Sequence, residues 1–279
     1  TSFNGNITRF SAARIPASDR AYLFGDAVYE GVRVYGGKRW LLSELMQRLR
    51  SSCAGIRLRL DEEQLEAHVR LLQAHAHLSE CFLYIQISGI GAARRHGLPN
   101  QREANYLVYL EDVAALAPTP PKITLKVQPD ERWHWRNLKT TNLLANCMAL
   151  QNAKDHGAEE ALLVDASGWI NEGSHSNFFA VTQGTLVTPP LTHNILPGVT
   201  REFVIELARA DSIAVDERPI HARELNSAAE VFMPGTTTEV RPVKAIDGIA
   251  VNGGEPGPIT DRLRTLYQAR GDAFVRSIV

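Results

Sequence analysis

The sequence is poor in cysteine and has no excess charge of either sign. Its three cysteines, Cys53, Cys81 and Cys147, lie far apart and form no CxxC pair. Neither a disulfide framework nor a zinc site is therefore expected, and a reducing compartment fits best. Lys plus Arg is 30 and Asp plus Glu is 31, giving a net charge of −1. A nucleic-acid-binding protein would usually carry a basic excess, so this class is not expected.

Long apolar segments are missing as well. The longest stretch without Asp, Glu, Lys or Arg, residues 173–200, contains prolines and histidines and is therefore not expected to span a membrane. Residues 1–10 lack the apolar core of a signal peptide. Of the 279 residues, 44% are hydrophobic and 22% are charged, as in globular proteins with one large or two modest domains. These features predict a cytoplasmic protein of enzyme size.

The N-terminal part of the chain alternates between strand and helix patterns. Residues 28–35 have a period of two, and the turn Gly36-Gly37 followed by residues 39–42 predicts a hairpin with a returning strand. Ser43 is expected to cap a helix that ends at Gly55. Other predicted helices begin at Asp61, cover 142–156, run from Pro197 to 210 and close the chain; other predicted strands are 81–87, 106–110, 123–127, 161–164, 177–181, 185–187, 231–233 and 238–243.

A proline-rich segment divides the chain. Three of the four residues 118–121 are proline, which excludes a helix or a central strand. We therefore expect a small N-terminal α+β domain (1–113), a linker (114–121) and a larger C-terminal domain (122–279). The mixed order of helices and strands, with many hairpins, indicates an α+β fold.

Lysine is scarce, with six lysines against 24 arginines, and one lysine has an unusual position. Lys139 lies in Asn137-Leu-Lys-Thr-Thr-Asn-Leu-Leu144, where a strand-like region changes into an apolar helix. A desolvated lysine has a lowered pKa and can act as a Schiff-base nucleophile. A lysine at a helix start can equally extend its charged end into solvent.

Three other segments could bind charged groups. Glu172 is crowded by small residues in Asn171-Glu-Gly-Ser-His-Ser-Asn177, where it could pair with a buried cation or occupy a turn. The turn Ile195-Leu-Pro-Gly-Val-Thr-Arg201 precedes a helix, and the first N–H groups of a helix attract phosphate, although many helices begin this way without a ligand. The glycine turn Gly235-Thr-Thr-Thr-Glu239 could also hold phosphate or merely begin a strand.

Together, and in this order, these motifs resemble the class IV (fold type IV) pyridoxal-phosphate aminotransferases. That family includes D-amino acid and branched-chain aminotransferases and aminodeoxychorismate lyase. The matching segments are Phe24-Gly-Asp26, Lys139–Leu144, Glu172–Asn177, Leu196–Arg201 and Gly235–Glu239. The resemblance covers nearly the whole chain and implies the two-domain fold type IV structure with pyridoxal 5′-phosphate as the cofactor.

The resemblance also implies which residues bind the cofactor. Lys139 would be joined to it covalently and would move the proton during catalysis, while Glu172 would keep the pyridine nitrogen protonated. The phosphate would be bound by Arg48, Val199, Thr200, Thr236 and Thr237. Leu45 departs from the pattern, because many relatives have a histidine there, and His175 has no assigned role.

The residues that hold the substrate carboxylate decide the subclass. Tyr29, Arg94 and His96 resemble the carboxylate-binding residues of D-amino acid aminotransferases, and Arg33, on the same strand face as Tyr29, is a candidate helper. In that family the arginine and the histidine come from the neighbouring subunit, so the resemblance implies a homodimer. A charged hydrogen bond from arginine to a carboxylate is worth about 1.5–3 kcal/mol, enough to orient a small amino acid. Residues 94–96 could equally form a solvated loop.

The sequence is therefore interpreted as a transaminase of D-amino acids, with 2-oxoglutarate or pyruvate as the acceptor. A branched-chain L-amino acid aminotransferase is the alternative, because Gly31-Val-Arg33 and Gly235-Thr-Thr resemble that group in part. Aminodeoxychorismate lyase is a weaker alternative, because Gly31 stands where a threonine is expected. A non-catalytic carrier of pyridoxal phosphate would differ from all three in a half-reaction with an amino donor. No metal, nucleic acid or membrane is expected as a partner.

Overall fold

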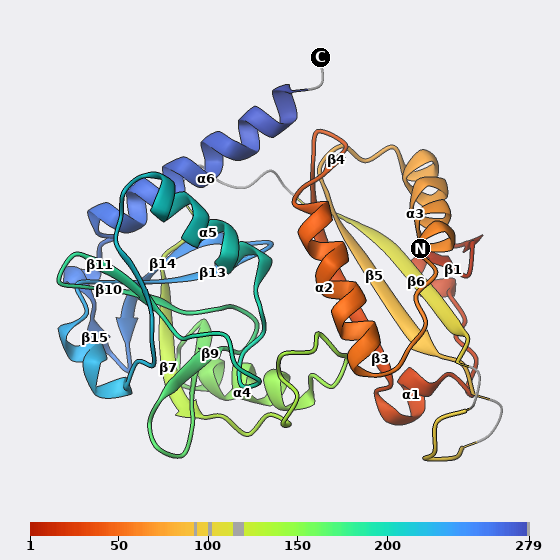
Figure 1. The fold of residues 1–279 in the computed structure, drawn as a ribbon, viewed down its shortest axis with the longest axis horizontal. Coiled ribbons are helices and arrows are strands. Elements are labelled where there is room, and N and C mark those ends of the chain that lie inside the picture. The colour runs from red at the N-terminus through yellow and green to blue at the C-terminus, as the bar shows by residue number, and fades with distance from the viewer. Residues whose placement is uncertain (92–93, 100–101, 114–119, 278–279) are drawn as a thin grey trace. The chain divides into compact units, whose positions relative to one another are not determined.

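The chain folds into two compact units (Figure 1). The computed structural model describes residues 1–91, 94–99, 102–113 and 120–277. One unit comprises Thr1–Ala115 with Leu138–Asn142, and the other comprises Leu116–Asn137 with Leu143–Val279. Most of the expected linker, 114–119, lies outside the described residues.

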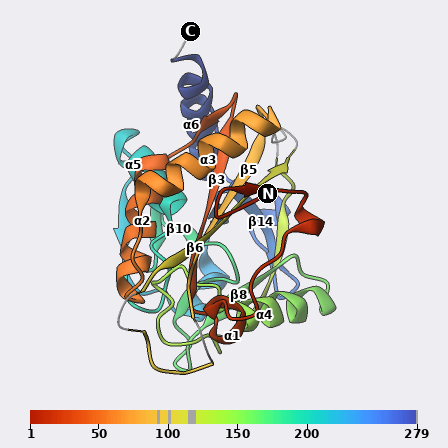
Figure 2. The same ribbon diagram turned by 90° about the vertical axis from the view of Figure 1, so that its right-hand side faces the viewer.

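The first unit contains an antiparallel sheet in the order β2-β1-β6-β5-β3-β4. Its elements are β1 (Ser2–Phe3), β2 (Asn6–Ile7), η1 (Phe10–Ala12), α1 (Arg20–Phe24), β3 (Ala27–Tyr35), β4 (Lys38–Arg39), α2 (Leu42–Gly55), α3 (Glu62–Ala76), β5 (Cys81–Gly89) and β6 (Ala104–Asp112). Helix α2 packs on β3 and α3 packs on β6, so both helices cover the same face of the sheet (Figures 1 and 2).

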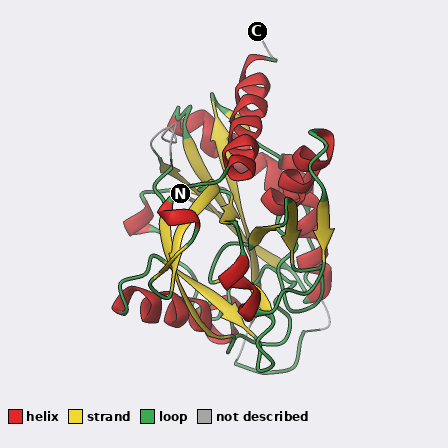
Figure 3. Cartoon of the chain, turned by 90° about the vertical axis from the view of Figure 1, so that its left-hand side faces the viewer, coloured by secondary structure: helices red, strands yellow, loops and turns green. Residues whose placement is uncertain are grey.

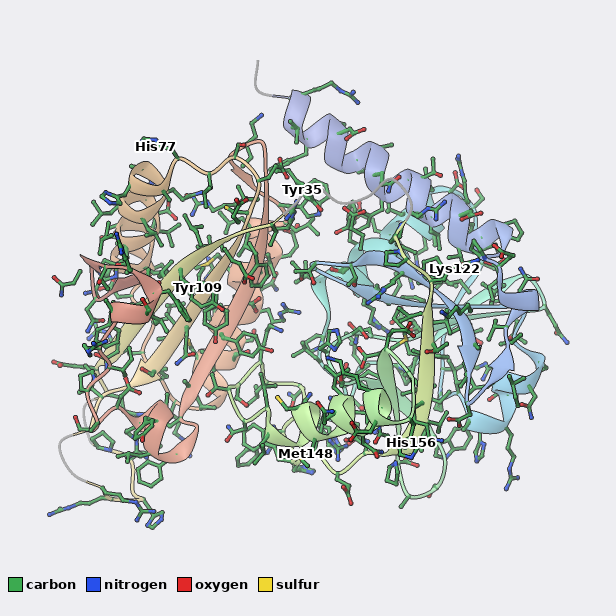
Figure 4. All side chains as sticks on the ribbon, turned by 180° about the vertical axis from the view of Figure 1, so that it is seen from behind. Tyr35, His77, Tyr109, Lys122, Met148 and His156 are labelled. Carbon is green, nitrogen blue, oxygen red and sulfur yellow. The ribbon has the colours of Figure 1, made fainter. Side chains whose placement is uncertain are left out.

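The alternation along β3 gives the two faces of this sheet different chemistry. Val28 and Val32 point toward the helices and are buried, as the period of two predicts. On the other face, the rings of Tyr29, Tyr84 and Tyr109 stack in a row across β3, β5 and β6, with centroid distances of 5.6 and 4.6 Å (Tyr109 is labelled in Figure 4). This face therefore carries aromatic rings beside the segment of Lys139.

The first predicted hairpin is shorter than expected. Gly36 and Gly37 have φ values of 55° and 80°, as a tight turn requires, but the returning strand β4 is only Lys38–Arg39. The prediction that Ser43 caps the next helix was wrong, because α2 begins at Leu42 with Leu41 as its N-cap residue. Asp61, by contrast, caps α3 as predicted and accepts a hydrogen bond from the Gln64 N–H.

The second unit contains a mixed sheet in the order β12-β11-β10-β13-β14-β7-β8-β9, with β15 paired to β14. Its strands are β7 (Ile123–Pro129), β8 (Glu160–Val164), β9 (Ile170–Gly173), β10 (Phe179–Thr182), β11 (Thr185–Thr188), β12 (Val215–Glu217), β13 (Glu230–Gly235), β14 (Glu239–Ile246) and β15 (Ile249–Ala250). Its helices are α4 (Leu144–Asp155), α5 (Val199–Ala210) and α6 (Pro258–Arg276), with the short turns η2 (Ala222–Ser227) and η3 (Asn252–Gly254). Helix α6 leads to the end marked C in Figure 3.

The strands of the second unit are apolar because their side chains form its hydrophobic core. Ile123, Leu162, Phe178 and Val231 are almost completely buried in one hydrophobic cluster. The sequence analysis did not predict β1, β2, β9, β12 and β15. In β9, Glu172 lies in a strand and not in a turn between strands. Its neighbours are small and polar, so the local pattern carried no strand signal. In the part of the chain that the structure describes, every helix is too short or too polar to cross a bilayer.

Candidate active site

Lys139 belongs to the first unit, although the sequence analysis placed it in the domain 122–279. Thr140 forms a bridge with Val28 of β3, and the Tyr29 N–H donates to the Lys139 carbonyl at 3.0 Å. The Lys139 N–H donates to Ser52 Oγ at 3.1 Å. Its Nζ lies 4.3 Å from the centre of the Tyr29 ring. The structure thus brings the predicted nucleophile and the predicted substrate-binding tyrosine together.

Arg48 is held by a carboxylate that the sequence analysis did not consider. The Nε and Nη2 atoms of Arg48 donate to the two Glu30 oxygens at 2.8 Å each, and both side chains are buried. Burial and the charge of Glu30 raise the pKa of the Cys53 thiol to about 12. A bidentate pair fixes the plane of a guanidinium group, so Arg48 has a defined orientation. The sequence carried one signal that Arg48 is buried, because Arg48 lies beside Leu45 and Leu49 on the buried face of α2.

Arg94 and His96 lie together in the exposed loop between β5 and β6. The guanidinium carbon of Arg94 is 5.4 Å from the centre of the Phe24 ring, and the His96 ring is also 5.4 Å from it. Within the described residues, no hydrogen bond, ion pair or ring contact joins either side chain to Tyr29. The structure therefore brings together two of the three predicted carboxylate-binding residues.

Arg33 forms an ion pair with Glu80. It is buried, its Nη2 donates to Glu80 Oε2 at 3.0 Å, and its guanidinium carbon lies 5.1 Å from the Tyr35 ring centre. Glu80 also accepts from the Gly36 N–H at 2.7 Å, which ties the pair to the hairpin turn. Because Glu80 offsets its charge, Arg33 is a weaker candidate for a substrate carboxylate than the exposed Arg94.

Glu172 lies at the centre of a hydrogen-bond network in the second unit. It accepts from Arg132 Nη1 at 2.6 Å, from Asn177 Nδ2 at 2.9 Å and from the Leu196 N–H at 3.2 Å. Burial raises the pKa of Glu172, and the charge of Arg132 opposes that shift. A buried carboxylate of this kind interacts strongly with any cationic N–H group that reaches it.

Arg132 and Asp130 complete this network, and the sequence analysis missed both. Arg132 Nε and Nη2 donate to the two Asp130 oxygens at 2.9 and 2.8 Å, and Asn171 Nδ2 donates to Asp130 at 2.8 Å. Burial acts to raise the pKa of Asp130, but the hydrogen bonds and charge of Arg132, the Asn171 amide and the charge of Arg136 together outweigh it, and the pKa is lowered. Arg132 is therefore a cation shared by Asp130 and Glu172. No local pattern marks it, because Glu172 lies 40 residues away.

The start of α5 is joined to Glu172 through Asn177. Asn177 Nδ2 donates to the Leu196 carbonyl at 3.0 Å as well as to Glu172. A Cβ atom on Gly198, the N-cap residue of α5, would overlap the Asn177 side-chain oxygen, so the close approach requires glycine. Val199 and Thr200 form the buried first turn of α5. Two predicted elements, the Glu172 segment and the turn before α5, therefore form one structure.

Thr236 and Thr237 lie in the turn between β13 and β14. The strand before that turn is joined to the Glu172 segment, because the Asn177 N–H donates to the Pro234 carbonyl at 3.3 Å. Helix α5 also packs on β13. The predicted phosphate-binding residues of the second unit thus occupy neighbouring elements.

His175, which had no role in the sequence analysis, pairs with a buried carboxylate. Its Nδ1 lies 2.8 Å from Glu160 Oε2, and its side chain is 54% exposed. Glu160 also accepts from the hydroxyl groups of Ser174 and Ser176. These contacts join β8 to the segment after β9.

Comparisons with known proteins cover most of the chain. The family model described as amino-transferase class IV matches residues 27–246. A D-alanine aminotransferase from Bacillus licheniformis is 34% identical over 273 residues, which are 95% of each chain. The solved branched-chain amino acid aminotransferase of Escherichia coli superposes with a TM-score of 0.84 at 29% identity, covering 94% of this chain and 91% of that one.

A second solved structure is a PLP form. The branched-chain amino acid aminotransferase of Thermobaculum terrenum, solved in its PLP form, superposes with a TM-score of 0.85 at 26% identity, covering 97% of this chain and 93% of that one. The family model spans most of the chain, and the α+β fold predicted from the sequence is confirmed by these neighbours. The chain therefore belongs to the class IV aminotransferases, a family of pyridoxal-phosphate-dependent enzymes.

Proposed function

We propose that this aminotransferase acts on D-amino acids and passes the amino group to a 2-oxo acid such as 2-oxoglutarate or pyruvate. The observation that carries the proposal is the pair Arg94 and His96, which the structure holds together on the Phe24 ring in an exposed loop. The exposed Arg94 provides donors that suit a carboxylate. Several D-alanine aminotransferases among the relatives, at 32% identity or more, support this assignment.

The residues present fit pyridoxal 5′-phosphate. In the first unit, Lys139 would hold its aldehyde carbon and Arg48 its phosphate, and the Glu30 pair leaves the Arg48 guanidinium oriented. In the second unit, Glu172 is a buried acceptor suited to a protonated pyridine nitrogen. The phosphate-binding groups proposed there are the first turn of α5, Val199 and Thr200, with Thr236 and Thr237. When bound, the cofactor supplies an electron sink for the carbanion at the substrate Cα.

The chain's own residues control proton positions in this chemistry. Arg132 opposes the rise in the pKa of Glu172 and so favours the carboxylate form that a protonated ring nitrogen requires. Lys139 Nζ carries the proton removed from Cα, and the Tyr29 ring beside it limits the directions that Nζ can take. Arg94 binds and orients the substrate carboxylate.

The proposal includes a homodimer in which the loop bearing Arg94 and His96 serves the site of the neighbouring subunit. Light scattering coupled to gel filtration measures the mass directly, and a monomeric active enzyme would contradict this part. Mixing Arg94→Ala subunits with Lys139→Ala subunits tests the sharing of residues, because some mixed dimers would regain one complete site.

The decisive experiment compares amino donors in single half-reactions. The wild-type holoenzyme should lose its visible cofactor band faster with D-alanine or D-glutamate than with L-leucine. Arg94→Ala should raise the KM for D-alanine about 10- to 150-fold, the equivalent of one charged hydrogen bond. Lys139→Ala should lose nearly all turnover and the cofactor that borohydride can fix to the chain; full activity in that variant would overturn the transaminase mechanism.

A branched-chain L-amino acid aminotransferase is the second candidate. The structural neighbours of that name favour it, and so does the partial resemblance of Gly31-Val-Arg33 and Gly235-Thr-Thr to that group. A faster half-reaction with L-leucine than with any D-amino acid would establish this alternative in place of the first.

A further inference from the structure

Helix α1 is anchored at both ends within the first unit. Its N-cap residue, the buried Asp19, accepts from the Ala21 N–H at 2.8 Å and from the side chains of Ser88 and Asn105 at 2.6 Å each. At its other end the Gly25 carbonyl accepts from the side chain of Asn142 at 3.0 Å. The helix is therefore fixed to β5 and β6 on one side and to the segment of Lys139 on the other.

The first residue of α1, Arg20, is hydrogen-bonded to the loop that follows β5. Arg20 is 4% exposed, and its Nε donates to Asp26 Oδ2 at 2.6 Å. Its two terminal nitrogens donate to the backbone carbonyls of Arg95, at 2.9 Å, and His96, at 3.5 Å. The fork of the guanidinium thus joins a fixed carboxylate to the backbone on which Arg94 and His96 are carried.

The last residue of α1 supports the side chains of the same loop. The guanidinium carbons of Arg20 and Arg94 lie 4.7 and 5.4 Å from the centre of the Phe24 ring, and the His96 ring lies 5.4 Å from it. A cation near an aromatic face is attracted by the ring quadrupole. Arg20 therefore orders the backbone of the loop while Phe24 orders its cationic side chains.

We propose that Arg20 is the positioning residue for carboxylate recognition by Arg94 and His96, with Phe24 as its support. This inference rests on the proposed function of those two residues. Residues 94–99 are all exposed, so without anchors the loop would lose conformational freedom when substrate binds. Ordering the loop beforehand removes that cost from substrate binding. Arg20 does not compete for the substrate, because Asp26 offsets its charge.

Asp26 has a second cationic partner besides Arg20, whereas the described contacts show no second side chain that donates to the carbonyls of Arg95 and His96. Arg102 Nη2 also donates to both Asp26 oxygens, at 2.6 and 2.5 Å. Asp26 therefore keeps a cationic partner when Arg20 is replaced, and the caps of α1 do not involve the Arg20 side chain. Loss of Arg20 should consequently affect the loop more than the stability of the unit.

The test uses the holoenzyme with Arg20→Met and Arg20→Lys. In Arg20→Met, the KM for D-alanine should rise about 10-fold or more while kcat stays within about twofold, because only ordering of the binding loop is lost. Arg20→Lys keeps one compact cation and should give an intermediate KM. A primary amine without a carboxylate, 2-aminobutane, should react at the wild-type rate in every variant, a result that general damage to the fold would not give.

Two further variants complete the design. Phe24→Leu keeps apolar volume but removes the ring beneath Arg94, so it should also raise the KM for D-alanine. If Arg20→Met does not fold, Phe24→Leu tests the proposal in its place. Arg14 is the matched control, because it also donates to backbone carbonyls, those of Ser11 and Ala13, at an exposed place. Arg14→Met should leave every constant unchanged.

The outcomes separate the inference from the proposed function. A wild-type enzyme that reacts with no D-amino acid overturns the proposed function, and with it the role of Arg20. A wild-type enzyme that does react, with an unchanged KM in Arg20→Met and Phe24→Leu, overturns the positioning role alone. Equal losses with D-alanine and with 2-aminobutane would also overturn it.

Discussion

Replacing Arg132 by methionine should destabilise the protein by an amount that grows with pH. Arg132 donates to Glu172 at 2.6 Å and to both oxygens of Asp130, and all three side chains are at least 93% buried. Methionine fills similar space but provides neither charge nor donors. Removing one partner of a buried ion pair typically costs about 3–5 kcal/mol, because the other charge is left without compensation.

The carboxylates left behind are not equally affected. Asp130 keeps the Asn171 amide and lies 3.7 Å from Arg136 Nη1, whereas Glu172 keeps only neutral donors among its described contacts. The pKa of Glu172 is already raised by burial, and loss of Arg132 should raise it further. An acid whose pKa is raised in the folded state contributes stability below its unfolded pKa, and that contribution is lost as the pH rises through the folded pKa.

The deficit of Arg132→Met should therefore be small near about pH 5 and approach about 3–5 kcal/mol near about pH 8. For a folding unit of this size, that corresponds to a Tm deficit of about 6–20 °C at the higher pH. Thermal unfolding followed by circular dichroism at several pH values measures it, and a deficit independent of pH would refute the reasoning.

The matched control is Arg218→Met. Arg218 also donates to a carboxylate, Glu224 Oε2 at 2.8 Å, but both side chains are about one-third exposed. The hydrogen bond from Arg218 lowers the pKa of Glu224, and without it that carboxylate would still be ionised above about pH 5. The control should therefore show a small, constant offset over the same range.

Two other predictions concern separate parts of the chain. Hydrogen bonds from Arg39 and Arg70 lower the pKa of Glu66 to about 2, so its stabilising contribution is present above its unfolded pKa and is lost as the pH falls through about 2. Glu66→Gln should be less stable than wild type at neutral pH and equal to it at the acid end, as acid titrations of thermal stability would show; a constant difference would contradict this. Gly198→Ala should displace the Asn177 side chain and slow the half-reaction. The loss of Tm should be small, because φ at Gly198 is −69° and suits alanine. Unchanged kinetics would contradict the role given to Asn177.

Local patterns and motifs were enough to predict most of the elements and the family. Alternating residues in 81–87 and 106–110 become β5 and β6, and the turn before residue 199 becomes the start of α5, because these features depend on local periodicity and local turn chemistry. The order of the motifs around Lys139 and Glu172 gave the family before any contact was known. Local patterns failed where polar residues form a buried strand, as in β9.

The tertiary structure alone decided which charges meet. Glu30 and Arg48 are 18 residues apart, Arg132 and Glu172 are 40 apart, and Arg20 donates to a carbonyl 75 residues further along the chain. Each contact depends on strand register and on how a helix packs against a sheet, neither of which has a local signal. The same long-range pairing moved Lys139 from the predicted C-terminal domain to the first unit, because its segment is hydrogen-bonded to β3. A buried polar group requires a partner, and only the packed chain supplies that partner.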